Sequence, residues 1–87
     1  MEVKNYLLSK NIQPKMKGFR YLVTAIEMCQ EQGCAKHLYD EIYPAIALLT
    51  NAKPENIARD VFYALSKTGM SATNFIARAL LDLEENK

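Results

Sequence analysis

Residues 43–65 read YPAIALLTNAKPENIARDVFYAL: an apolar helical segment, a short polar break and a second, amphipathic segment. Ala47 and Ile57 lie ten residues apart in it, one in each segment. In a helix-turn-helix, a small residue on the first helix allows close approach, and a branched residue on the second fills the space between the two. The spacing therefore predicts a helix-turn-helix, although many helical hairpins would pass the same test.

The second helix of this motif is predicted over residues 54–67. Pro54 suits the first position of a helix, and Glu55 in the first turn complements the helix dipole. Apolar residues recur along one side, which we expect to be buried: Ile57, Ala58, Val61, Ala64 and Leu65. The outward side carries polar residues: Asn56, Arg59, Tyr63 and Ser66. Such side chains hydrogen-bond to base edges or phosphates, but an ordinary solvated face has the same composition, and periodicity leaves both interpretations open.

Phe62 and four lysines are further candidates for contacts with a partner. Phe62 falls at the margin of the apolar stripe, where an exposed aromatic ring suggests a contact with a partner. Lys53 lies in the turn before the helix, and Lys10, Lys15 and Lys17 fall close together earlier in the chain. Lysines grouped in this way are able to contact phosphates, and ordinary solvated lysines would give the same pattern.

The helix predicted over residues 18–31 has the clearest apolar periodicity in the chain, with Phe19, Leu22, Val23, Ile26 and Cys29 on one side. Because it is apolar over much of its girth, we expect it to be buried on more than one side and to form the centre of the core. Gly33 is predicted to end it. Before it, residues 2–10 predict a short helix that stops at Asn11, followed by a connector over residues 12–17.

The helix that precedes the 51–53 turn is interrupted by Pro44. Segments 35–42 and 44–50 form either one kinked rod or two abutting pieces, and we favour the kinked rod. Its expected core face is Leu38, Ile42, Ala45, Ile46 and Leu49. A last helix, capped by Ser71 or Thr73, runs to about residue 85 with Phe75, Ile76, Ala79, Leu80 and Leu83 on its core face. The pattern predicts an all-α, compact five-helix domain that contains the helix-turn-helix.

The composition suits a single globular domain over residues 1–87, with 49% hydrophobic and 24% charged residues. No apolar run reaches the length of a membrane span and the N-terminal residues lack a secretory leader, so we expect no membrane contact and a cytoplasmic location. The net charge is only +1, so any nucleic-acid contact depends on where the 11 lysines and arginines lie.

Catalytic and metal-binding patterns are missing from the sequence. Cys29, Cys34 and His37 lie near one another but have no fourth ligand at a suitable spacing, so we expect no metal site. The sequence shows no carboxylate pair, nucleophile–base set or phosphate-binding glycine loop. We therefore expect neither an enzyme nor a cofactor, and no small-molecule substrate.

Three segments occur in a distinctive order: KGFRYL at 17–22, LYDEIYPAIA at 38–47 and IARDVFYAL at 57–65. Together they resemble the C-terminal DNA-binding effector domain of the stage-zero sporulation transcription factor family. The resemblance implies an all-helical fold, binding of duplex DNA with the second helix of the helix-turn-helix in the major groove, and pairing of two copies on tandem sites. We expect residues 1–87 to be one effector-like domain, without the receiver domain that the family carries.

The resemblance also assigns individual residues. Arg59 matches an arginine that reads bases in the family pattern. Ala58, Phe62 and Tyr63 stand where that pattern has glutamate, arginine and histidine, and Asn56 occupies the place of another arginine. Each lost arginine contact removes on the order of 1–3 kcal/mol, so we do not expect the family's target sequence to transfer to this chain.

Two functions remain after these exclusions. The first is a sequence-specific DNA-binding domain that regulates transcription in sporulation, with base contacts from Arg59, Asn56 and Tyr63 and phosphate contacts from Lys53, Lys15 and Lys17. The second is a protein–protein interaction module that kept the fold but lost specific DNA binding, with Phe62 and Tyr63 as aromatic anchors. The retained arginine and the lysine in the turn favour the first, which we adopt, and the depleted basic face favours the second.

Overall fold

The computed structural model describes residues 2–32 and 38–85. Within these ranges the backbone forms five α-helices and one π-helical turn, and no strand: α1 (Val3–Ser9), α2 (Lys17–Gln32), η2 (Leu38–Ile42), α3 (Tyr43–Thr50), α4 (Pro54–Ala64) and α5 (Ala72–Glu85). The predicted all-α, five-helix architecture is confirmed.

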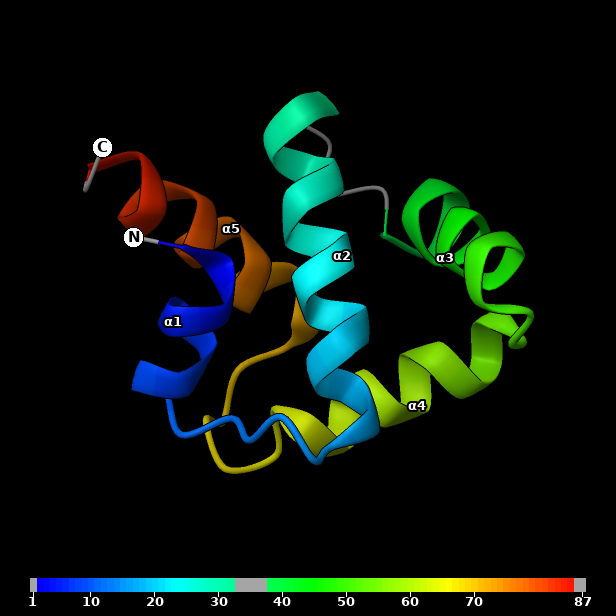
Figure 1. Cartoon of the computed structure of the whole chain (residues 1–87), viewed down its shortest axis with the longest axis horizontal. Helices are drawn as coiled ribbons and strands as arrows, with labels where there is room; N and C mark the ends of the chain where they lie inside the picture. Colours follow the sequence, from blue (N-terminus) through cyan, green and yellow to red (C-terminus); the bar gives the residue numbers. More distant parts are fainter. Residues whose placement is uncertain (1, 33–37, 86–87) are drawn as a thin grey trace.

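Helix α2 is the centre of the molecule, as its apolar periodicity predicted. It packs against each of the other four α-helices. Figure 1 shows it standing between α1 and α5 on one side and α3 and α4 on the other. All five residues of its predicted apolar stripe are buried, and Leu22 and Ile26 are fully buried. A helix buried on several sides joins the two halves of the fold through a single core.

Individual residues at the ends of three helices explain why these helices stop or start there. Asn11, two residues after the end of α1, has a φ of 66°, and Asn51, directly after α3, has a φ of 60°. Asparagine tolerates this left-handed conformation, which turns the chain away from the helix axis. At the start of α5, the hydroxyl of Ser71 accepts a hydrogen bond from the backbone N–H of Asn74 at 3.2 Å. Of the two residues predicted to cap this helix, Ser71 is therefore the cap.

The chain passes from η2 into α3 without an extended break. Ile42, at the junction, has helical dihedral angles of −74° and −51°. Pro44 lies in the first turn of α3, so the helical pitch changes where proline removes a backbone hydrogen bond. This agrees with the continuous rod. The predicted beginning of that rod near residue 35, the stop at Gly33, and Cys34 and His37 lie outside the described residues.

One prediction about side-chain placement was wrong. Leu49 was expected in the core but is 74% exposed, and its neighbour Leu48 is 88% exposed. Tyr43 occupies the inner side of α3 and is only 1% exposed, which turns the buried face of this uniformly apolar helix away from Leu49. Two leucines at the end of α3 therefore face solvent.

The second helix of the motif was also predicted too long, because α4 ends at Ala64 rather than at residue 67. The hydroxyl of Ser66 donates to the carbonyl oxygen of Tyr63 at 2.9 Å, and that of Thr68 donates to Leu65 at 2.7 Å. These bonds satisfy carbonyl groups that a longer helix would have paired. Ser66 therefore belongs to the following turn and not to the outward face of α4.

A polar clasp joins α1 to α5. The hydroxyl of Tyr6 donates a hydrogen bond of 2.7 Å to Oδ2 of Asp82, and its ring packs edge-on against Phe75. Arg78 pairs with the same carboxylate, with Nε 3.4 Å from Oδ1. Burial, together with the hydrogen bond to Asp82, raises the pKa of Tyr6 to about 12.

Candidate nucleic-acid interface

Helix α4 is pressed against the beginning of α2 at Gly18. A Cβ atom at this position would overlap the carbonyl oxygen of Asp60 and lie 2.8 Å from Cβ of Ala64. Only glycine permits this approach of one helix backbone to the other. The contact fixes α4 relative to the core, so its outward side chains project from a rigid support.

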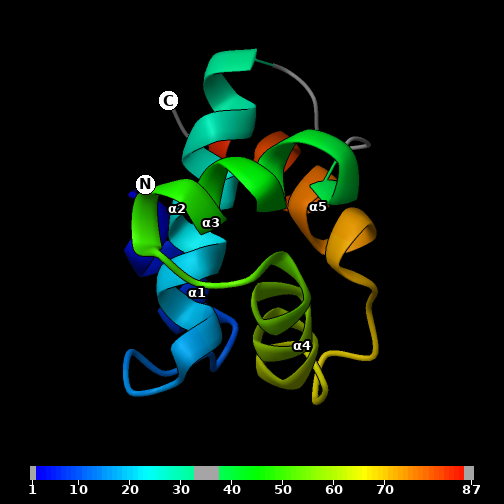
Figure 2. The ribbon, with the colours of Figure 1, turned by 90° about the vertical axis from the view of Figure 1, so that its right-hand side faces the viewer.

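The two sides of α4 differ sharply in exposure. Ile57 and Val61 are fully buried, whereas the side chain of Arg59 is 58% exposed and Tyr63 is 64% exposed. Ala47 on α3 is partly buried against the same core as Ile57, as the helix-turn-helix spacing predicted. Figure 2 shows α3 running across the view above α4, which is seen nearly along its axis, with the turn between them.

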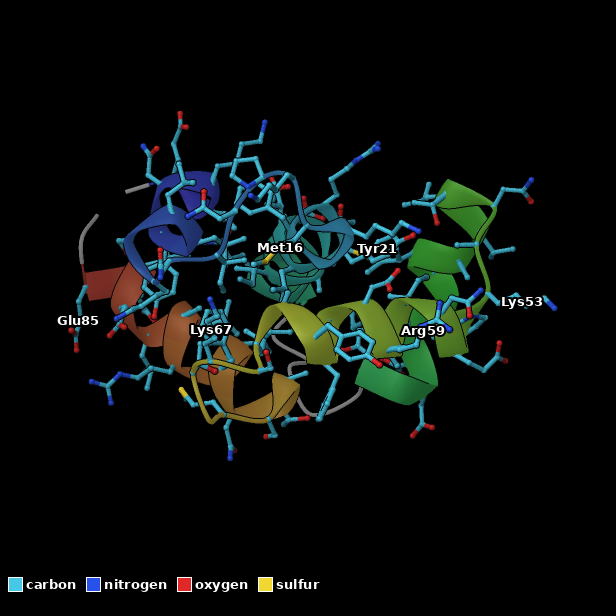
Figure 3. The ribbon with its side chains drawn as sticks, turned by 90° about the horizontal axis from the view of Figure 1, so that it is seen from below. Met16, Tyr21, Lys53, Arg59, Lys67 and Glu85 are labelled. Atoms are coloured by element: carbon cyan, nitrogen blue, oxygen red, sulfur yellow. The ribbon has the colours of Figure 1, made fainter. Side chains whose placement is uncertain are left out.

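The base-contacting candidates lie on one side of α4. Arg59 points toward the viewer in Figure 3, from the middle of the helix. Its Nε is 3.9 Å from Oδ1 of Asp60, a distance at which the adjacent carboxylate holds it only weakly. Asn56 is half-buried one turn before Arg59, and Tyr63 follows one turn after it. A single side of α4 thus offers an amide, a guanidinium and a phenol.

The phosphate-contacting candidates surround this side. Lys53 is exposed just before α4, and Figure 3 shows it extending from that end of the helix. Lys17 and Tyr63 line one open hollow between the beginning of α2 and α4. Lys15 is exposed in the connector two residues earlier. Lys10 belongs elsewhere, because its Nζ lies 5.4 Å from the centre of the Tyr6 ring on α1.

The structure adds residues that were not among the candidates predicted from the sequence. A second hollow, of about 440 Å³, separates α2 from the end of α3 and is lined by Lys17, Arg20, Tyr21, Thr24, Leu49 and Thr50. Residues 17, 20, 21 and 24 recur at helical spacing on the side of α2 opposite its buried stripe. This polar periodicity is visible in the sequence and is the signal by which these residues of α2 can be identified. Lys67, in the turn after α4, is a further exposed cation beyond the other end of that helix (Figure 3).

The described part of the chain has neither a cluster of metal ligands nor a helix of membrane-spanning character. Residues 2–32 and 38–85 contain no group of three histidine, cysteine or acidic side chains placed to hold a metal ion. Cys29, one member of the trio considered from the sequence, is buried in the core. None of the described helices is long and apolar enough to span a membrane.

The comparison with known families agrees with this geometry. The family model described as "Sporulation initiation factor Spo0A C terminal" matches residues 3–81. Searches of curated proteins and of solved structures gave no match. The family match spans α1, α2, the helix-turn-helix and most of α5. This chain therefore belongs to the Spo0A C-terminal family, a family of DNA-binding transcription factor domains rather than of enzymes.

Proposed function

We propose that this chain binds duplex DNA sequence-specifically as a transcriptional regulator of the sporulation type, with α4 in the major groove. The observation that carries the proposal is the exposure of Arg59 and Tyr63 on a helix whose opposite side, at Ile57, is fully buried. A helix-turn-helix presents its second helix in this way to base edges. Arg59, Asn56 and Tyr63 provide the base contacts.

Lysines on either side of α4 provide the phosphate contacts in this proposal. Lys53 reaches one strand from the turn, and Lys15 and Lys17 reach the backbone from the connector and the beginning of α2. Phosphate contacts position a protein on the duplex, and base contacts specify the sequence. Residues 1–87 act as one effector domain in the cytoplasm, and two copies pair on adjacent sites.

The first test is a titration with random-sequence duplex DNA at low and moderate salt. Three phosphate contacts predict that the logarithm of the association constant falls with the logarithm of salt concentration with a slope of about −3. A slope near zero, or no binding at low salt, would exclude the proposed phosphate contacts.

The matched pair Arg59→Ala and Arg78→Ala tests the assigned face. Both arginines are largely exposed, with 58% and 69% of their side chains accessible, but Arg78 lies on α5 in the other half of the molecule. Arg59→Ala is expected to weaken DNA binding by about 1–3 kcal/mol. Arg78→Ala, which removes the same charge, is expected to leave binding nearly unchanged. Equal effects would show that only net charge matters.

The alternative function is a protein-interaction module, and one observation favours it. Phe62, Leu48 and Leu49 are 70%, 88% and 74% exposed, and large exposed apolar side chains mark many protein interfaces. This alternative predicts no DNA binding at low salt. It also predicts that Phe62→Ala abolishes self-association or partner binding, which analytical ultracentrifugation measures.

A further inference from the structure

Two aromatic rings stand side by side on the exposed surface of α4. Phe62 is 70% exposed and Tyr63 is 64% exposed. Their centroids lie 6.1 Å apart with the planes at 69°, an edge-on arrangement that holds the rings together. This pair forms an exposed, mainly apolar surface next to polar residues.

The rings share the outward side of α4 with Arg59. Phe62 follows Arg59 by three residues and Tyr63 follows it by four, and residues at these spacings are neighbours on a helix surface. If Arg59 reaches base edges, the two rings reach the same groove. Phe62 carries no hydrogen-bonding group, so it is unable to pair with the donors and acceptors that base edges offer.

One apolar group is displayed at the base edges of the major groove. Thymine presents a C5 methyl group there, and apolar side chains, phenylalanine included, recognise it by contact. Asn56, on the same helix, has the side chain that pairs with N6 and N7 of adenine, the partner base of thymine. The outward side of α4 therefore carries complementary groups for both members of an A·T pair.

We propose that Phe62, supported by the Tyr63 ring, is a specificity-determining residue that packs against thymine C5 methyl groups in the major groove. This inference rests on the proposed function and names the class of base pair that the site selects. The domain favours sites in which A·T pairs adjoin the base that Arg59 contacts.

The experiment changes only the methyl group of the DNA. Hairpin duplexes with an alternating A·T stem are prepared with thymine or with uracil, and duplexes with an alternating G·C stem are prepared with cytosine or with 5-methylcytosine. Each pair differs only at the major-groove C5 position. We expect uracil to weaken wild-type binding about four-fold for each methyl contacted, and 5-methylcytosine to strengthen it by a similar factor.

Two variants assign the effect to the ring. Phe62→Ala is expected to bind the members of each pair equally, because the contacting ring is gone. Leu81→Ala removes an apolar side chain of similar exposure, 59%, from α5 and is expected to keep the wild-type preference. Urea unfolding of both variants checks that they remain folded.

Three results would overturn the inference. Equal wild-type affinity for methylated and unmethylated duplexes, with binding that still weakens with salt, would reject methyl recognition and leave the proposed function standing. A methyl preference that persists in Phe62→Ala would assign it to DNA deformability or to another residue. Absence of binding to all four duplexes would reject the proposed function and this inference together.

Discussion

The two halves of the molecule, on either side of α2, use their polar side chains differently (Figure 1). Between α1 and α5, Tyr6, Asp82 and Arg78 bind one another. Beside α4, the side chains of Lys53, Asn56 and Lys17 make no hydrogen bond or ion pair with any other residue that the structure describes. The first half uses polar contacts to hold its helices together. The second half is held by apolar packing, which leaves its polar groups available to a partner.

If apolar packing alone supports α4, truncating its buried side chain has the largest effect on stability. Ile57→Ala removes a fully buried residue at the contact between α3 and α4 and is expected to cost about 2–5 kcal/mol. Leu49→Ala, at 74% exposure on α3, is the matched control and is expected to change stability by less than about 0.5 kcal/mol. Urea denaturation followed by circular dichroism measures both. Similar losses in the two variants would mean that Leu49 is covered in solution.

The polar clasp of the other half predicts a loss of stability at high pH. The pKa of Tyr6 is raised from 10.0 to about 12, so the folded state favours the neutral phenol. Its contribution is complete below pH 10 and is lost as the pH rises through 12, with a total of roughly 2–3 kcal/mol. Denaturation midpoints between pH 9 and 12 measure this loss.

Tyr6→Phe isolates the effect, because it keeps the ring against Phe75 and removes the titrating hydroxyl. The variant is expected to be less stable than the wild type at pH 8 and to lose less stability as the pH rises to 12. A wild-type and variant difference that stays constant over this range would contradict the raised pKa.

The contact at Gly18 gives a prediction of somewhat smaller size. Gly18→Ala places a Cβ against the backbone of Asp60 and is expected to cost about 1–3 kcal/mol, although alanine is the better helix former. Gly69→Ala is the comparison, because no atom lies within 4 Å of its added Cβ and only its φ of +71° opposes the change. That strain alone costs roughly 1 kcal/mol.

DNA binding separates these two glycine variants further. Gly18→Ala shifts α4 relative to α2 and is expected to weaken binding even where the protein is fully folded. Gly69→Ala lies beyond α4 and is expected to bind normally. A stabilised Gly18→Ala variant would show that the two helices are not in contact.

The sequence predicted the buried residues well where apolar and polar positions alternate with helical periodicity. In α2 and α5 a polar side remains beside the apolar residues, so periodicity alone identified Leu22 and Phe75 as core. It failed for α3, because residues 43–49 are apolar on every side and packing decides which side turns inward. The choice of Tyr43 over Leu49 depends on the surrounding helices, and no local pattern contains that information.

The sequence predicted which residues of α4 belong to the candidate site, but not which residues of other helices lie next to them. The spacing from Ile57 indicated that Arg59 and Tyr63 face outward, and both are exposed. That Lys17 lines one hollow with Tyr63 follows from the close approach of two helices at Gly18. This approach joins residues more than forty positions apart, so it becomes visible only in three dimensions.

The smallest expected effect is the loss of stability when an exposed arginine is replaced by alanine. Arg78 and Arg59 lie in different halves, so this loss compares the two halves directly. Arg78→Ala breaks an i,i+4 pair with the carboxylate that Tyr6 also binds, and is expected to cost about 0.3–0.5 kcal/mol. Arg59→Ala breaks only a 3.9 Å contact between adjacent residues and is expected to cost less than that. Urea denaturation at low ionic strength resolves the difference, and high salt reduces it. For DNA binding we expect the opposite order, with Arg59→Ala weakening the affinity more than Arg78→Ala. If Arg59→Ala proved the more destabilising variant, the guanidinium of Arg59 would be bound to another group of the protein. The contrast between a half whose polar side chains bind one another and a half whose polar side chains are available to a partner would then be wrong.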